Sequence, residues 1–184
     1  WRHWQAADDV LLMAPSTDTV GRLNQIAQQR RIAAGELDGD DHLELPGGVR
    51  LHVGDRITTR RNERTIRTNR HEMIRNRDTF EVSFLHDDGG IAAIGPTGLV
   101  VLPPAYVAEH VELAYAVTAM GAQGRTVDHA ITLLDGVTDV RNLYVPMTRG
   151  RESNHAYLAI DGEDTAADVF ARYLTNDWID LPAH

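Results

Sequence analysis

Two short polar clusters hold the residues of this chain that could do chemistry. One is the string TAMGAQGRT at residues 118–126, and the other is LYVPMTRGR at residues 143–151. In the first, Gln123 offers both a hydrogen-bond donor and an acceptor, and backbone N–H groups beside a glycine such as Gly124 can bind phosphate oxygens. In the second, Arg149 has a guanidinium that stays charged and offers forked donors. These groups are suited to binding an anion such as a phosphate.

Apolar runs beside the two clusters predict the strands that would position them. The runs are Ala114 to Val117, Ala130 to Leu134, Asn142 to Val145 and Ala156 to Ile160, and each is bounded by turn residues. Continuous apolar runs of this length are typical of strands buried on both faces, as in a parallel sheet. Open α/β sheets bind ligands at the ends of their strands, so the sequence predicts an α/β fold with both clusters at strand ends.

The two clusters resemble motifs V and VI of superfamily-one helicases. TAMGAQGRT is similar to T-x-H-x-x-Q-G-x-T, and LYVPMTRGR is similar to L-Y-V-a-x-T-R-x-r, in the family's order. The resemblance is to RecD-like helicases and to the helicase part of MobF-type conjugative relaxases (TraA, TrwC and TraI-like). Met120 departs from the usual His and Gly121 from a frequent Lys, and we expect Met120 to be a packing residue.

This resemblance implies a role for individual residues. Arg149 is expected to be the catalytic arginine finger, which stabilises charge on the transferred phosphoryl group and can supply ~10³–10⁵ in rate. The implied nucleotide contacts are Gln123, Gly124, Arg149 and Arg151, and the implied contacts to single-stranded DNA here are Thr118, Gln123 and Thr126. The alternatives are a surface salt bridge for Arg149, a loop-orienting role for Arg151 and ordinary strand-end hydrogen bonding for the two threonines.

The chain has no lysine, because all 18 of its Lys and Arg residues are arginines. A Walker A loop needs G-K-[ST] to hold nucleotide phosphates, so this chain cannot contain one. It also has no apolar strand that ends in Asp-Glu. We therefore expect ATP with Mg²⁺ to be bound mainly by a first, N-terminal RecA-like domain of a longer parent chain, and we expect this chain alone to hydrolyse no ATP. The start at Trp1 is typical of a piece of a longer protein.

The beginning and the end of the chain predict further α/β elements. Val10 to Ala14 reads as a buried strand, followed by a helix that Ser16 or Thr17 caps and that Gly35 ends. The same segment opens the second RecA-like domain in the resembled helicases, where Asn24 has a counterpart; the alternative for Asn24 is a surface or capping residue. A closing helix is predicted at residues 165–174.

Residues 46–104 have a different sequence pattern, in which short runs of strand-forming residues are separated by Gly-rich turns. This pattern predicts a small antiparallel barrel, with a hairpin turn at Asp87 to Gly90. The resembled family carries an inserted SH3-like barrel at this place, and Arg77 stands where the family often has Gly. The predicted organisation is a discontinuous RecA-like domain at residues 8–45 and 105–184, interrupted by the SH3-like barrel at residues 46–104.

Eight arginines lie within residues 56–77, offset only by Glu63 and Glu72. Such a segment can bind nucleic-acid phosphates, and we expect Arg60 and Arg61 to be among the DNA contacts. The alternative is a solvated hairpin that is disordered without its partner. That alternative is favoured by the absence of aromatic residues for base stacking in this stretch. The net charge of −9 also argues weakly against a general polyanion binder.

The composition excludes several classes of protein. The chain has no Cys, so it can form neither disulfides nor thiolate metal sites, and its nine His residues show no metal-binding spacing. No apolar run approaches the ~20 residues of a membrane helix, and no signal peptide opens the chain. We therefore predict a cytoplasmic protein with no membrane segment.

These expectations describe the C-terminal motor domain of an ATP-dependent DNA helicase, from a conjugative relaxase in the first instance. Its expected partners are single-stranded DNA, the N-terminal RecA-like domain of the same parent chain and relaxosome proteins. The alternative is a non-catalytic module, left from a degenerate helicase region, that docks DNA or a protein. The departure at Met120 favours this alternative.

Overall fold

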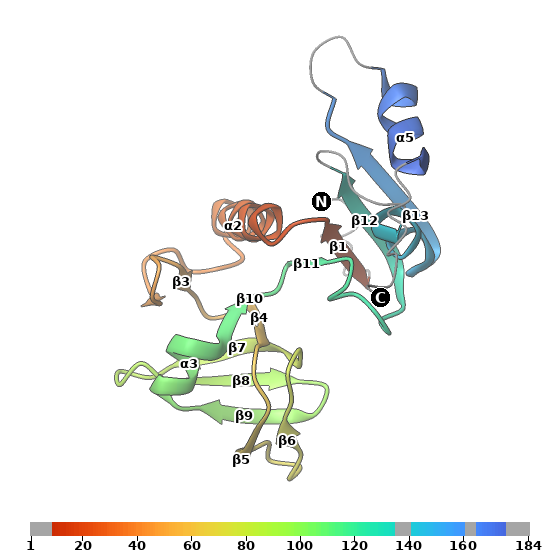
Figure 1. Ribbon diagram of the computed structural model, residues 1–184. Helices are drawn as coiled ribbons and strands as arrows, with labels where there is room; N and C mark the ends of the chain where they lie inside the picture. The colour runs from red at the N-terminus through yellow and green to blue at the C-terminus, as the bar shows by residue number, and fades with distance from the viewer. Residues whose placement is uncertain (1–8, 135–140, 161–164, 176–184) are drawn as a thin grey trace, which may run out of the picture. The chain divides into compact units, whose positions relative to one another are not determined.

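The computed structural model describes residues 9–134, 141–160 and 165–175. The chain divides into two compact units, which are residues 1–22 with 116–184 and residues 23–115. We call them the parallel-sheet unit and the antiparallel-sheet unit after their main sheets (Figure 1). The first division falls inside a helix, α2 (Thr17–Ala33), and the second falls directly after Tyr115.

The parallel-sheet unit is built on four strands in the order β11-β1-β12-β13, all parallel. They are β1 (Val10–Ala14), β11 (Ala116–Thr118), β12 (Val127–Leu134) and β13 (Gly150–Leu158). Leu11, Met13 and Ala130 form a core cluster in this sheet, as expected for apolar strands of a parallel sheet. The predicted α/β fold with a parallel sheet is confirmed.

One predicted strand of this unit is wrong. Residues Asn142 to Val145 were expected to be a strand, but Arg141–Tyr144 is a helical turn, α4, and Pro146–Thr148 is a 3₁₀ helix, η1. The reason is topological: β12 and β13 pair directly in parallel, so the chain between them must cross over the sheet. A short apolar run cannot be told from a helical turn by its pattern alone.

The predicted helices are confirmed with the caps that the sequence indicated. The N–H of Thr19 donates to Ser16 Oγ at 3.1 Å at the start of α2, and Gly35 follows its end with a φ of +72°. The closing helix is α5 (Ala166–Thr175), which lies beside β13 (Figure 1). At its start the N–H of Asp168 donates to Thr165 Oγ1 at 3.3 Å.

The antiparallel-sheet unit has five strands in the order β10-β4-β7-β8-β9. They are β4 (Arg56–Thr59), β7 (Thr79–Leu85), β8 (Ile91–Gly95), β9 (Gly98–Leu102) and β10 (Val111–Leu113). Two small hairpins and a helix complete it: β2 (Leu43–Glu44) with β3 (Arg50–Leu51), β5 (Glu63–Arg67) with β6 (Met73–Ile74), and α3 (Pro104–His110). The predicted hairpin turn is present, because the N–H of His86 donates to Gly90 O at 2.9 Å. The SH3-like description and the domain bounds stay predictions.

The Arg-rich segment 56–77 is folded, contrary to the alternative of a disordered hairpin. It forms β4, β5 and β6, with Thr59 and Ile74 fully buried. Arg77 has a φ of +72°, in the left-handed region that favours glycine. This conformation explains why a Gly suits the position in the resembled family.

A buried polar network joins α2 to the strands of the antiparallel-sheet unit. Asp55 is fully buried, and its carboxylate accepts hydrogen bonds from Gln28 Nε2 at 2.6 Å, from the N–H of His52 at 2.7 Å and from the hydroxyl of Tyr115. Arg31 Nη1 in turn donates to that hydroxyl at 3.2 Å. Burial is the main cause that raises the pKa of Tyr115 above its ordinary value of 10.0.

Asn24 also joins α2 to the antiparallel-sheet unit, and it is neither a surface nor a capping residue. Its side chain is buried, and Nδ2 donates to the carbonyl of Leu113 in β10 at 2.9 Å. A buried amide with a partner of this kind positions two elements relative to each other.

Candidate functional site

The two polar clusters meet at the edge of the parallel sheet where β12 and β13 begin. The N–H of Val127, the first residue of β12, donates to the carbonyl of Arg149 at 3.0 Å. Arg149 directly precedes β13, and Val127 is paired with Gly150 in the register of the two strands. The chain segments that resemble motifs V and VI therefore lie side by side.

The guanidinium of Arg149 is held by three oxygens of these segments. Its Nε donates to Val145 O at 3.1 Å, Nη2 donates to Thr148 Oγ1 at 2.9 Å, and Nη1 makes a longer contact of 3.4 Å with Arg125 O. The Thr148 hydroxyl also donates to Val145 O at 2.9 Å, which fixes the loop. Arg149 is half-buried, so it is not sealed in the core. Its acceptors are neutral oxygens, and an anionic oxygen would be a stronger partner for a guanidinium.

The backbone after Arg149 is clamped by Asn154. Asn154 Oδ1 accepts the N–H of Gly150 at 2.8 Å, and Nδ2 donates to the carbonyl of Gly150 at 3.0 Å. A Cβ on Gly150 would lie 2.0 Å from Ser153 O, which no side-chain movement can relieve. Only glycine fits at position 150. It therefore fixes the path of the backbone between Arg149 and β13.

The turn at residues 119–126 is shaped by its own hydrogen bonds. Thr118 Oγ1 accepts the N–H of Gly121 at 3.0 Å, so the Thr118 side chain has the structural role of closing this turn. Gln123 is exposed. Met120 is 73% exposed, so the expectation that it packs in the core is wrong. Ala122 is the residue of this turn that is fully buried.

Two backbone donors of this turn are available to a ligand. Among the described residues, no acceptor is bonded to the N–H of Gly124 or of Thr126. Gly124 has a φ of +80°, and the space where its Cβ would stand is open. The two donors flank Arg125, whose carbonyl contacts the Arg149 guanidinium. Backbone N–H groups without acceptors beside a glycine are an arrangement that fits a phosphate.

Arg151 is engaged in ion pairs on the same edge. Its Nη2 lies 2.7 Å from Asp128 Oδ1 and 3.7 Å from Asp9 Oδ2. The hydrogen bond to Asp128 is the main cause that raises the pKa of Arg151, which therefore stays charged. These contacts join the starts of β12 and β1, so they support the loop-orienting alternative for Arg151 over a direct nucleotide contact.

Thr118 lies at the opposite edge of the sheet from Arg149. Thr118 is paired with Ala14 at the carboxyl end of β1, at the level of Leu133 in β12. From Val127 to Leu133 is six residues (133 − 127), or about 20 Å at ~3.3 Å per residue. The structure thus gathers Gly124, Thr126, Arg149 and Arg151 and places Thr118 apart from them. Thr126, which was expected to contact DNA, lies with residues that were expected to contact the nucleotide.

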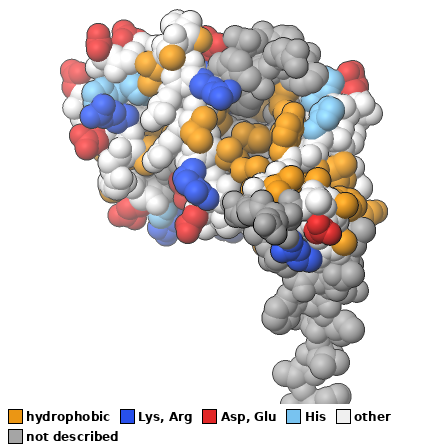
Figure 2. Space-filling model, turned by 90° about the horizontal axis from the view of Figure 1, so that it is seen from above, with side chains coloured by type: hydrophobic (Ala, Val, Ile, Leu, Met, Phe, Trp, Pro, Cys, Tyr) orange, Lys and Arg blue, Asp and Glu red, His pale blue; other side chains and the backbone are white. Residues whose placement is uncertain are grey.

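Arg60 and Arg61 lie in the antiparallel-sheet unit, beside the end of α3. Arg60 Nε is 3.5 Å from Glu112 Oε2, and Arg61 Nη1 is 3.3 Å from His110 Nε2. Both guanidiniums are largely exposed, so these contacts are weak and could be exchanged for phosphates. On the face shown in Figure 2, basic side chains stand singly among acidic ones, and hydrophobic side chains gather near the centre.

Sequence reasoning missed three residues of the site. Gly150 and Asn154 set the start of β13, and Arg125 supplies a carbonyl to Arg149. The string T-R-G-R contained the signal for Gly150, because glycine is the residue that allows a close approach of the backbone. Asn154 and Arg125 act through contacts that only the folded loops create.

The described ranges 9–134, 141–160 and 165–175 contain neither a metal-binding cluster nor a membrane-spanning helix. No group of three His, Asp or Glu residues there could hold a metal ion. No helix there is long and apolar enough to cross a bilayer.

Comparison with other sequences gives only a partial match. No protein-family model matches the chain. The uncharacterized proteins MT2373 and Rv2311 of Mycobacterium tuberculosis are each 43% identical to it over 66 residues. That match covers 35% of this chain and 38% of each relative, so the chain matches well under half of either protein.

Comparison with solved structures finds Pif1 helicases. Bacteroides Pif1 bound to single-stranded DNA has a TM-score of 0.54 at 16% identity over 79% of this chain, and its complex with ADP-AlF3 and single-stranded DNA has 0.55 at 17% over 90%. Pif1 of Candida albicans has 0.52 at 12% over 89%. This chain covers 40%, 45% and 47% of those chains. The likeness shows that this chain shares the RecA-like α/β fold of these structures.

Proposed function

We propose that this chain is the second RecA-like domain of an ATP-dependent DNA helicase, with an inserted SH3-like barrel. The observation that carries the proposal is the position of Arg149. Its guanidinium contacts the carbonyl of Arg125, and the N–H groups of the neighbouring Gly124 and Thr126 have no acceptor among the described residues. A nucleotide phosphate fits these donors, and the printed sequence has no lysine to form the phosphate-binding loop of a complete ATP site.

The roles follow from the chemistry of the residues. Bound ATP with Mg²⁺ would supply the phosphoryl group to be transferred, and it would be held mainly by an N-terminal RecA-like domain of the same parent chain. Arg149 would exchange its neutral acceptors for phosphate oxygens and stabilise the charge that develops on them. Gln123 and Gly124 would contact the nucleotide, and Arg151 would keep the loop in place through Asp128.

The proposed second ligand is single-stranded DNA, which is bound in two of the Pif1 structures. Thr118, Gln123 and Thr126 would contact it from the parallel-sheet unit, and Arg60 and Arg61 from the other unit. We further propose that the parent is a conjugative relaxase–helicase that acts in the cytoplasm with relaxosome proteins. This part of the proposal depends on the resemblance of the two motifs, and a RecD-like helicase is the next candidate.

The test joins this chain to the upstream part of its parent and measures DNA-stimulated ATP hydrolysis. Arg149→Ala is expected to lower kcat by ~10³ or more, because it removes the proposed finger. Arg50→Ala is the matched control, since Arg50 is an exposed arginine in the other unit and should leave the rate unchanged. The chain alone should hydrolyse no ATP.

The exposed Met120 favours a second candidate, a docking module whose motor is degenerate, because it replaces the usual motif V His on the surface of the turn. Equal rates for the wild type and Arg149→Ala would support this module and contradict the motor. Loss of DNA stimulation with normal basal hydrolysis in Met120→Ala would instead assign the exposed side chain to the DNA response of an active motor.

A further inference from the structure

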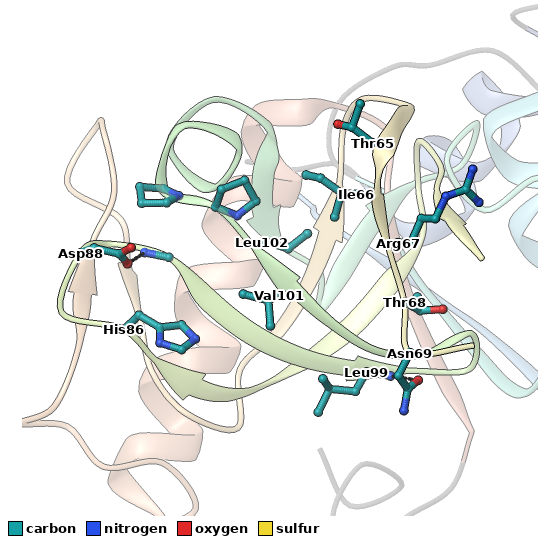
Figure 3. A pocket seen from close by; sticks show the side chains of 13 residues that line it. Thr65, Ile66, Arg67, Thr68, Asn69, His86, Asp88, Leu99, Val101 and Leu102 are labelled. Atoms are coloured by element: carbon teal, nitrogen blue, oxygen red, sulfur yellow. Dashed lines mark hydrogen bonds between the residues drawn. The ribbon is translucent and has the colours of Figure 1, made fainter. Parts of the chain in front are cut away.

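The antiparallel-sheet unit contains a groove of 680 Å³ between β5 and β9. Figure 3 shows Ile66 and Arg67 on one wall, Val101 and Leu102 near the middle, and His86 on the opposite side. At one end of the groove Asn69, two residues beyond β5, donates its N–H to Leu99 O in β9 at 2.8 Å. From there the two strands diverge.

Strand β9 has an open edge along this groove. It is the last strand in the sheet order, with β8 on its other side. The N–H of Leu99 donates to Asn69 Oδ1 at 3.0 Å, so the backbone groups of Leu99 point toward the groove. Alternate residues of a strand direct these groups to the same side, so the N–H and C=O of Val101 also point there. Within the described residues, nothing pairs with Val101 on that side.

The side chains around the open edge are aliphatic. Val101 is 54% exposed and Leu99 is 38% exposed, and Ile66 stands across from them on β5. Pro103 follows β9 and has no N–H, so it ends the pairing edge after Val101. An unpaired apolar edge of this kind is a template for an added strand.

The groove also contains an unsatisfied polar atom. His86 Nε2 is buried without a hydrogen-bond partner in the described part of the chain, and the ring lies edge-on to Phe84 with 5.0 Å between the ring centroids. Leaving such a group unpaired is costly, so a turn of the ring that brings Nε2 to a ligand atom in the groove is favoured. Arg67 places a guanidinium on the facing wall, and Asp88 places a carboxylate on the His86 side.

We propose that this groove binds an extended peptide segment of a partner protein, by addition of a strand to the open edge of β9. The peptide backbone pairs with the N–H and C=O of Val101. One apolar side chain of the peptide packs on Leu99, Val101 and Ile66, an acidic residue faces Arg67, and a polar side chain bonds to His86 Nε2. Main-chain pairing supplies affinity, and the pockets for alternate side chains supply specificity.

A peptide fits this groove better than single-stranded nucleic acid. Bases bind such surfaces by stacking on aromatic side chains, and the groove lining is aliphatic apart from the His86 ring. It also offers a single guanidinium, whereas a strand edge matches the repeat of a peptide backbone.

The test titrates the ¹⁵N-labelled 184-residue chain with five heptapeptides that alternate glutamate with Val, Ile, Leu, Phe or Tyr. At ~1 mM peptide, at least one should shift the amide resonance of Val101 and the imidazole resonances of His86. The same peptide with N-methylated amides should not, because it cannot pair with a strand edge. If no peptide shifts Val101, or if only an oligo(dT) strand does, the proposal is overturned.

Variants of the groove check the same binding with the peptide that shifts Val101. Val101→Pro removes only the outward N–H and should weaken binding at least tenfold, while His86→Phe keeps a ring without the polar atom and should weaken it several-fold. Ile94→Thr is the control, because Ile94 is 52% exposed on β8 but does not line the groove. Wild-type affinity in Val101→Pro would rule out edge pairing, and if that variant fails to fold, the N-methylated peptides decide.

Discussion

Arg149 shows how a proposed arginine finger can be held in place before its ligand binds. Its three guanidinium nitrogens contact Val145 O, Arg125 O and Thr148 Oγ1, all neutral and all belonging to the two motif loops. These contacts hold the side chain near the surface without committing it to a buried ion pair. A charged phosphate oxygen forms a stronger hydrogen bond with guanidinium than a carbonyl does, so exchange needs no other change in the loop.

Gly150 is the residue next to Arg149 that tolerates no side chain. Gly150→Ala is expected to destabilise the chain by about 2–3 kcal/mol, because its Cβ would lie 2.0 Å from the backbone oxygen of Ser153. The measurement is the free energy of unfolding in urea. Gly21→Ala is the matched control: it has open space in the middle of α2 and should stabilise by ~0.5–1 kcal/mol. An unchanged stability in Gly150→Ala would contradict the close approach.

Arg77 should tolerate glycine better than other arginines of the same segment. Its φ of +72° costs a non-glycine residue ~1–2 kcal/mol, whereas glycine loses only ~0.4–1 kcal/mol through the unfolded chain. Arg77→Gly should therefore be neutral or raise the free energy of unfolding by up to about 1 kcal/mol. Arg75→Gly, at a position without positive φ, should lower it. If both substitutions destabilise equally, the left-handed conformation is wrong.

At the scale of elements, the buried carboxylate of Asp55 fastens helix α2 and Tyr115 to the antiparallel sheet. Asp55→Asn replaces one acceptor oxygen by an amide that faces donors, and we expect a loss of about 2–4 kcal/mol in the free energy of unfolding. Denaturant unfolding measures it. Asp87→Asn, at an exposed carboxylate in the β7–β8 turn, is the control and should change stability by less than ~0.5 kcal/mol.

The same network predicts how stability depends on alkaline pH. The pKa of Tyr115 is raised in the folded chain, so above pH 10 the unfolded chain releases this proton while the folded chain keeps it. The contribution of Tyr115 to the free energy of unfolding is fully present below pH 10. It falls as the pH rises above that value, by at most ~1.4 kcal/mol per pH unit. Unfolding free energies at pH 9, 10 and 11 should show the fall, and Tyr115→Phe should make it shallower. Tyr157→Phe, at an exposed tyrosine, should leave the fall as it is.

At the scale of the whole molecule, the proposed binding of single-stranded DNA would have to occur against a net charge of −9. Binding can then come only from local groups, and it should weaken steeply with salt because phosphate contacts release counterions. The double variant Arg60→Ala/Arg61→Ala should reduce the slope of log K against log salt by about 1.4, at ~0.7 per contact. A fluorescence titration at four salt concentrations measures the slope. Arg50→Ala is the control, and an unchanged slope in the double variant would remove both side chains from the phosphate contacts.

Much of the architecture could be predicted from local patterns. The runs at Val10–Ala14 and Ala130–Leu134 are strands. An apolar run of five residues bounded by turns is too short for a typical buried helix, so a buried strand is the expected structure. The caps of α2 could be predicted because Ser16 and Gly35 act through their own backbone neighbourhood. Residues Asn142 to Val145 were predicted wrongly because a run of only three apolar residues after Asn142 fits a helical turn as well as a strand.

The sequence by itself determined the parallel sheet, the two motif clusters and the absence of a lysine for a phosphate-binding loop. These features depend only on composition and on patterns between near neighbours in the chain, which do not change when the chain folds. Only the tertiary structure decided which members of the clusters meet. The register of β1, β11, β12 and β13 places Thr118 and Arg149 on opposite edges, and long-range hydrogen bonds hold Asn24 and Asp55 inside. Such contacts join residues far apart in the chain, so no local pattern encodes them.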